Sequence, residues 1–167
     1  MLSRIDFILG KVEEYFIATL LLVASILLFA NVVGRYVFGT SVLGAEELVR
    51  YMIVWMVFVG GSVAARKGIH IGVDAFLKFS GARVARIISI VVLLICICFT
   101  VTLFYYGLWH TMDVYQFGQR SSALRLPYWI AQAAIPVGAG LMAIRFTQRL
   151  VALLRARQDR SELEMIG

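Results

Sequence analysis

Four long stretches without a charged residue constrain this chain more than any other feature of its sequence. An α-helix rises about 1.5 Å per residue, so about 20 apolar residues cross the roughly 30 Å hydrocarbon core of a membrane. The stretches cover residues 15–34, 51–65, 87–112 and 126–144. Three of them are long enough to span a membrane as they stand, and the second is too short.

The composition excludes a water-soluble fold. Of the 167 residues, 61% are hydrophobic and 16% are charged, whereas soluble domains have about 45–50% apolar and about 25% charged residues. The net charge of +6 does not indicate nucleic-acid binding, because the basic residues lie between the apolar stretches, where positive charge sets topology. We therefore predict an all-α integral membrane protein with four transmembrane helices and no nucleic-acid partner.

The second stretch must borrow polar residues from the segment before it. A helix that begins near residue 46 places Glu46 and Glu47 in its first turn, where carboxylates meet the positive end of the helix dipole. Either glutamate can also pair with Arg50, one turn later. Glu46 and Glu47 could cap this helix, dock a partner or do both, and the sequence leaves these roles open. The predicted spans are about 15–34, 46–65, 87–112 and 126–144, in one membrane domain over residues 1–157 with a flexible cytoplasmic tail at 158–167.

The distribution of Lys and Arg predicts the orientation. With four spans, both termini and the connection between the second and third spans share one side of the membrane. That side carries twelve of the sixteen Lys and Arg residues. The positive-inside rule then places both termini in the cytoplasm. The outward-facing basic residues are Arg35, Arg50, Arg120 and Arg125.

Two further segments are expected to form amphipathic helices at the membrane interface. In residues 1–14, apolar side chains recur every three or four positions, so this helix should lie at the cytoplasmic interface before the chain turns into the first span. Residues 69–80 are too polar to span. They include His70 and Asp74 at i,i+4 spacing, but two ligands do not make a metal site. A hydrogen-bonded interfacial pair is the expectation there.

Small residues and prolines indicate how the helices pack. Gly60 and Gly61 are each followed four residues later by alanine, a spacing that allows close helix approach in lipid. Packing within this chain is favoured over a subunit interface for these pairs. Pro127 suits the first turn of the last span, and Pro136 is expected to kink it. Other residues expected to have structural or interfacial roles are Asn31, Trp55 and Arg66.

The predicted spans lack the polar side chains that chemistry at membrane depth requires. They hold no Asp, Glu, Lys or Arg at mid-depth. A small autonomous four-helix exporter needs a titratable carboxylate there, and the membrane anchor of a redox enzyme needs paired histidines for haem. His70 and His110 are predicted on opposite sides of the membrane. Both classes remain as alternatives, but the empty interior favours an accessory subunit whose partner carries the transport sites.

Three segments occur in a characteristic order: "NVVGRYVF", then "GAEELVRYMIVWMVFVGGSVAARKGIHIGVD", then "LRLPYW" before a last span that contains proline. This order resembles the small permease subunit of TRAP transporters, the tripartite ATP-independent periplasmic systems of bacteria. The resemblance covers nearly the whole chain. The residues that carry it include Glu46, Glu47, Trp55, Arg66, His70 and Asp74.

The resemblance implies a division of labour among three proteins. A periplasmic solute-binding protein captures an organic acid anion, and a large membrane subunit carries it with sodium by an elevator-type movement. The small subunit anchors the large one and helps to receive the binding protein. For this chain it implies a multi-pass protein of the bacterial inner membrane in contact with lipids, no enzyme activity and no cofactor, with sodium bound in the large partner. The residues expected to dock partners are Arg35, Glu46, Glu47, Arg50, Arg120 and Arg125.

Overall fold

The computed structural model describes residues 2–41, 43–67 and 82–166, which are helical except for the connections between the helices. Four helices in this part of the chain are long and apolar enough to cross a membrane, so the all-α, four-span prediction is confirmed and the chain is a multi-pass membrane protein. The helices are α1 (Leu2–Val37), α2 (Ala45–Lys67), α4 (Ala82–Gln116), the short α5 (Trp129–Gln132) and α6 (Ala134–Ile166).

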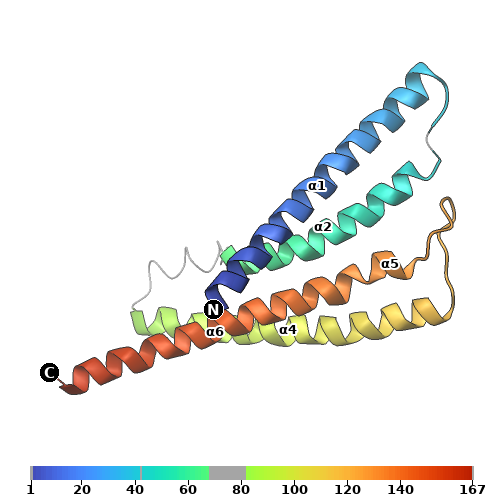
Figure 1. Ribbon diagram of the computed structural model, residues 1–167. Helices are drawn as coiled ribbons and strands as arrows, with labels where there is room; N and C mark the ends of the chain where they lie inside the picture. The colour runs from blue at the N-terminus through green and yellow to red at the C-terminus, as the bar shows by residue number, and fades with distance from the viewer. Residues whose placement is uncertain (1, 42, 68–81, 167) are drawn as a thin grey trace.

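The long helices form a single layer and not a closed bundle (Figure 1). Their order across the layer is α1, α2, α6, α4, since α2 packs against α1 and α6, and α6 packs against α4. In the described residues, the backbone of α1 does not come close to that of α6 or α4. The two edge helices, α1 and α4, therefore leave most of their apolar side chains exposed. A membrane layer of this kind offers large faces to lipid or to another membrane protein.

Small residues set the closest contacts within the layer. A Cβ atom on Gly138 of α6 would lie 2.6 Å from the backbone oxygen of Phe58 in α2. One on Gly61 of α2 would lie 2.8 Å from the sulfur of Met142 in α6. Helices in lipid associate through such close packing, because hydrophobic burial gives them no advantage over contact with lipid tails. Gly61 and Gly138 thus have close contacts inside this chain.

The last span is interrupted near its proline. Helix α5 ends at Gln132 and α6 begins at Ala134, four and two residues before Pro136 respectively. Proline cannot donate a hydrogen bond to the carbonyl four residues earlier, and its ring clashes with that carbonyl. For Pro136 that carbonyl belongs to Gln132. The position of the break thus follows directly from the chemistry of proline.

Two boundaries differ from the sequence predictions. Helix α1 runs without a break from Leu2 to Val37, so the turn expected after residue 14 is absent. No proline or other strong helix-breaking residue stands at that point of the sequence, and α1 continues through it. Helix α6 continues to Ile166, although a flexible tail was predicted from residue 158. The predicted helix at 69–80, with His70 and Asp74, lies outside the described residues.

Candidate functional site

Two connections, residues 38–44 and 117–128, lie at the same end of the layer, which we call the loop end (Figure 1). The second connection is closed by an isolated β-bridge between Arg120 and Pro127 and by a hydrogen bond from the Ser121 amide to the Leu126 carbonyl, 2.9 Å long. Arg125 has a φ of 53°, which reverses the chain within this turn. The side chains of Arg120 and Arg125 are both exposed.

Glu47 fastens this connection to α2. Its Oε2 atom accepts hydrogen bonds from the backbone amides of Ala123 and Leu124, at 3.1 and 3.0 Å. The Leu124 side chain lies directly against Gly44, where a Cβ atom would overlap it, and Gly44 has a φ of 79° that favours glycine. The Glu47 carboxylate is therefore occupied by its own chain.

Glu46 pairs with a different helix. The guanidinium of Arg35, near the end of α1, lies 2.8 Å from Oε1 of Glu46, and both side chains are more than half exposed. Both glutamates lie in the first turn of α2, as predicted. The expected pairing with Arg50 is not found, because these carboxylates contact α1 and the 117–128 connection instead.

An open pocket of about 410 Å³ lies between these groups. Arg50 lines it and is exposed, and no ion pair within the described residues involves it. The buried Asn31 of α1 also lines the pocket. Four of the six predicted docking residues thus line one pocket: Arg35, Glu46, Glu47 and Arg50. The other two, Arg120 and Arg125, lie on the neighbouring 117–128 connection. Their docking role stays a prediction.

Trp55 ties the middle of the layer together. Its indole N–H donates a 3.1 Å hydrogen bond to the carbonyl oxygen of Ile130 in α5. Carbonyls in the last turn of a helix lack helical partners, so the short α5 supplies an acceptor. The ring of Trp55 also contacts Phe16 of α1 edge to face, with centroids 6.1 Å apart. Trp55 therefore links α1, α2 and α5.

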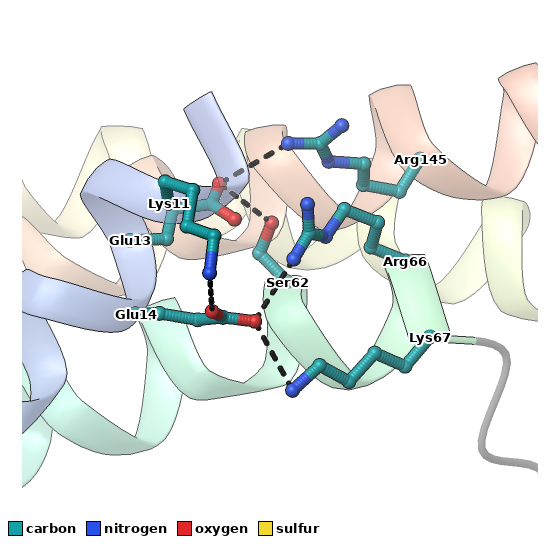
Figure 2. Close-up of polar contacts among 7 residues, drawn as sticks. All are labelled: Lys11, Glu13, Glu14, Ser62, Arg66, Lys67 and Arg145. Carbon is teal, nitrogen blue, oxygen red and sulfur yellow. Dashed lines mark hydrogen bonds and ion pairs between the residues drawn. The ribbon is translucent and has the colours of Figure 1, made fainter. Parts of the chain in front are cut away.

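The opposite end of the layer holds a group of charged side chains that the sequence analysis did not find. We call it the charge cluster, and Figure 2 shows its members: Lys11, Glu13, Glu14, Ser62, Arg66, Lys67 and Arg145. Glu13 of α1 is only 4% exposed. Its Oε1 atom accepts a 3.1 Å hydrogen bond from the hydroxyl of Ser62 in α2 and lies 3.6 Å from the guanidinium of Arg145 in α6. This carboxylate thus contacts two other helices.

Glu14 pairs with the two basic residues at the end of α2. Its carboxylate lies 2.9 Å from the Arg66 guanidinium and 3.1 Å from the Lys67 ammonium group, with Lys11 at 3.8 Å (Figure 2). The Arg66 side chain passes directly over Gly10 of α1, where any Cβ atom would overlap it. Gly10 therefore makes room for the contact between Arg66 and Glu14.

The charge cluster joins α1, α2 and α6 by ion pairs. The sequence predicts an interfacial helix that includes Glu13 and Glu14, because the uncharged stretch begins only at Tyr15. The signal that was available is the matching of charges on one side: two adjacent carboxylates precede the first span, and Arg66 and Lys67 end the second. The described residues include no group of three or more His, Cys, Asp or Glu side chains that could hold a metal ion.

Comparison with known proteins identifies the family. Residues 24–156 match the family described as "Tripartite ATP-independent periplasmic transporters, DctQ component". The C4-dicarboxylate TRAP transporter small permease protein of Vibrio cholerae is 30% identical over 95% of this chain and 78% of its own length. The ectoine TRAP transporter small permease protein of Halomonas elongata is 29% identical over 94% of this chain and 81% of its own length.

A longer permease protein also matches this chain. The isethionate TRAP transporter permease protein DctMQ of Oleidesulfovibrio alaskensis is 29% identical over 86% of this chain, which covers 23% of that protein. These relatives are permease components of transporters and not enzymes. The match over most of the chain confirms the resemblance drawn from its motifs: this four-span membrane protein belongs to the DctQ family of small permease components of TRAP transporters.

Proposed function

We propose that this chain is the accessory subunit of a transporter that takes up an organic acid anion together with sodium. It holds a large membrane subunit in the bacterial inner membrane and helps a periplasmic solute-binding protein to dock. The large subunit, and not this chain, carries the substrate and the sodium ions. Two relatives are named for organic anions, C4-dicarboxylates and isethionate, which supports an anionic substrate.

The open layer is the observation that carries this proposal. Its edge helices α1 and α4 expose long apolar faces, and in the described residues the two helices do not approach each other to close a bundle. A stationary scaffold needs broad contacts of this kind, built from packing in lipid. The DctMQ relative, which has a much longer chain, supports a stable association with a larger permease.

The buried charges support an accessory role as well. Charged groups within a membrane protein often mark a path for ions or substrate. Here the Glu13 carboxylate is held by Ser62 and Arg145 of neighbouring helices. The charge cluster lies near the C-terminal end of α2 and the first part of α1, and not across the middle of the layer. Its geometry fits a tie between helices better than a transport path.

The loop end is the proposed contact for the solute-binding protein. It combines the exposed Arg35–Glu46 pair with exposed Arg50, Arg120 and Arg125. Long-range steering by such charges accelerates association and is screened by salt, which suits a reversible encounter. A permanent interface would be more apolar.

Reconstitution into liposomes tests the proposal. Sodium-driven uptake of organic anions should require the large subunit, this chain and the binding protein together. The matched controls are this chain alone, and the large subunit with the binding protein but without this chain. Uptake by this chain alone, or full activity without it, would contradict the accessory role.

A further inference from the structure

A second pocket lies between the end of α2 and the middle of α6, beside the charge cluster. Its volume is about 280 Å³, and three of its lining residues are arginines: Arg66, Arg145 and Arg149. Gln148 and Arg149 are exposed, while the Arg145 side chain is only 3% exposed. Arginines from two helices thus line one small space.

Among the residues that the structure describes, cationic side chains outnumber carboxylates around this pocket. The charge cluster has four cationic side chains and two carboxylates, and Arg149 adds a fifth positive charge. The Nε atom of Arg66 is buried and has no hydrogen-bond partner in the described part of the chain. Positive charge removed from water is stabilised by an anion that also accepts hydrogen bonds. The pocket therefore has the properties of an anion site.

The position of the pocket along the membrane identifies the anion. The last candidate span begins at Trp129, and Arg145 and Arg149 follow 16 and 20 residues later. At about 1.5 Å per residue these arginines lie about 24–30 Å along the helices from that start, near the far edge of a roughly 30 Å hydrocarbon core. Arg66 is at the same level, next to the last residue of α2. Lipid phosphates lie at this depth.

We propose that this pocket binds the phosphate group of an anionic phospholipid. The planar guanidinium of Arg149, with that of Arg66, offers paired donors that match phosphate oxygens. Basic pockets between transmembrane helices are a known form of headgroup site. The exposed apolar side chain of Ile144, which precedes the arginines on the membrane side of α6, supplies a surface for acyl chains. Lipid bound there neutralises the cluster and fills the space between α2 and α6.

Native mass spectrometry of the full chain with its large subunit tests the proposal. The complex is titrated in detergent with phosphatidylglycerol, with phosphatidylcholine and with inorganic phosphate. Arg149→Gln should weaken binding of phosphatidylglycerol about fivefold, the usual effect of one basic residue near an anionic surface. Arg149→Lys should weaken phosphatidylglycerol binding less, because lysine keeps the positive charge. The matched control is Arg155→Gln, the same change at an exposed position of α6 outside the pocket, which should bind as the unmodified chain does.

A second variant, Gln148→Glu, separates an effect on lipid binding from an effect on folding. Arg149 is exposed and has no ion pair within the described residues, so its replacement should leave assembly intact. Gln148→Glu adds a negative charge to the lining without removing any arginine, and should weaken phosphatidylglycerol binding by a similar factor.

Four results would overturn the proposal. Equal binding of phosphatidylcholine would remove the anionic specificity, and displacement by inorganic phosphate at equal concentration would assign the pocket to a free anion. Equal losses of phosphatidylglycerol binding in Arg149→Gln and Arg155→Gln would show that basic residues attract the lipid generally and that the pocket is not a specific site. Loss of the large subunit in Arg149→Gln, with lipid binding unchanged, would make the pocket a contact for an acidic segment of that protein.

Discussion

Two pairs of adjacent glutamates occupy opposite ends of this layer and are held in opposite ways. Glu13 and Glu14 belong to the charge cluster, where Glu13 is 4% exposed and paired with side chains of α2 and α6. Glu46 and Glu47 lie at the loop end, where Glu46 forms an exposed ion pair and Glu47 binds backbone amides. The same dipeptide therefore joins helices at one end and organises loops at the other.

Exposure to solvent explains why the ion pairs at the two ends differ in their contribution to stability. Exposed ion pairs contribute about 0–1 kcal/mol, because water and salt screen them. Removing one partner of a buried pair costs about 3–5 kcal/mol, because it leaves an uncompensated charge away from water. We infer that the charge cluster fixes how α1, α2 and α6 pack, whereas the loop end remains available for reversible contacts.

The largest expected effect is on the stability of the charge cluster. Glu13→Gln removes the buried carboxylate that lies 3.6 Å from the Arg145 guanidinium and should lower the free energy of unfolding by about 3–5 kcal/mol. Thermal unfolding in mild detergent measures this loss. The matched control is Glu46→Gln at the loop end.

A double variant sharpens this first prediction. Because Arg145→Met removes the buried positive charge that lies beside Glu13, Glu13→Gln with Arg145→Met should be more stable than Glu13→Gln alone. A cost for Glu13→Gln no larger than that for Glu46→Gln would break the comparison between the two ends.

A smaller and local effect is expected at Glu47. Glu47→Gln weakens two charge-assisted hydrogen bonds and should let the 117–128 connection open more often, while the helices stay packed. Hydrogen exchange at the Ala123 and Leu124 amides should become about tenfold faster. Exchange at residues of α2 near Ser62 is the internal control. Unchanged exchange at the two amides would show that the carboxylate does not hold this connection.

The helices themselves were predictable from the sequence for a simple reason. A membrane span requires about 20 residues with few charges. Three of the four uncharged stretches lie within one of the spans found, and the fourth overlaps Trp129–Arg155 over most of its length. The placement of Glu46 and Glu47 in a first turn followed from the shortness of the second stretch. The break before Pro136 followed from the geometry of proline.

Tertiary partners were not predictable in the same way. Ser62 and Arg145 contact Glu13 from 49 and 132 residues away, which depends on α1 and α6 flanking α2. An uncharged stretch says that a helix spans the membrane, but not which helix lies beside it. The open layer was missed for the same reason, and with it the burial of Glu13.

A still smaller effect on folding is expected for the exposed pair. Glu46→Gln should change the free energy of unfolding by less than about 1 kcal/mol, since both members are more than half exposed. Titration with salt provides the check, because the remaining difference from the unmodified chain should vanish as the charges are screened. A cost comparable to that of Glu13→Gln would mean that the Arg35–Glu46 pair holds α1 against α2.

The smallest effect on stability, and the one that separates docking from folding, is expected at Arg50 and Arg125. Neither has an ion pair in the described residues, so Arg50→Glu and Arg125→Glu should leave the unfolding temperature unchanged. If the loop end receives the binding protein, each reversal should slow association at low salt and have little influence at high salt, because steering acts through long-range charge. Surface plasmon resonance with the intact membrane complex measures the association rate. Arg155→Glu, at the end of the last candidate span and away from the loop end, is the matched control and should leave that rate unchanged. Equal slowing by Arg155→Glu would place the contact elsewhere and end the case for the loop end.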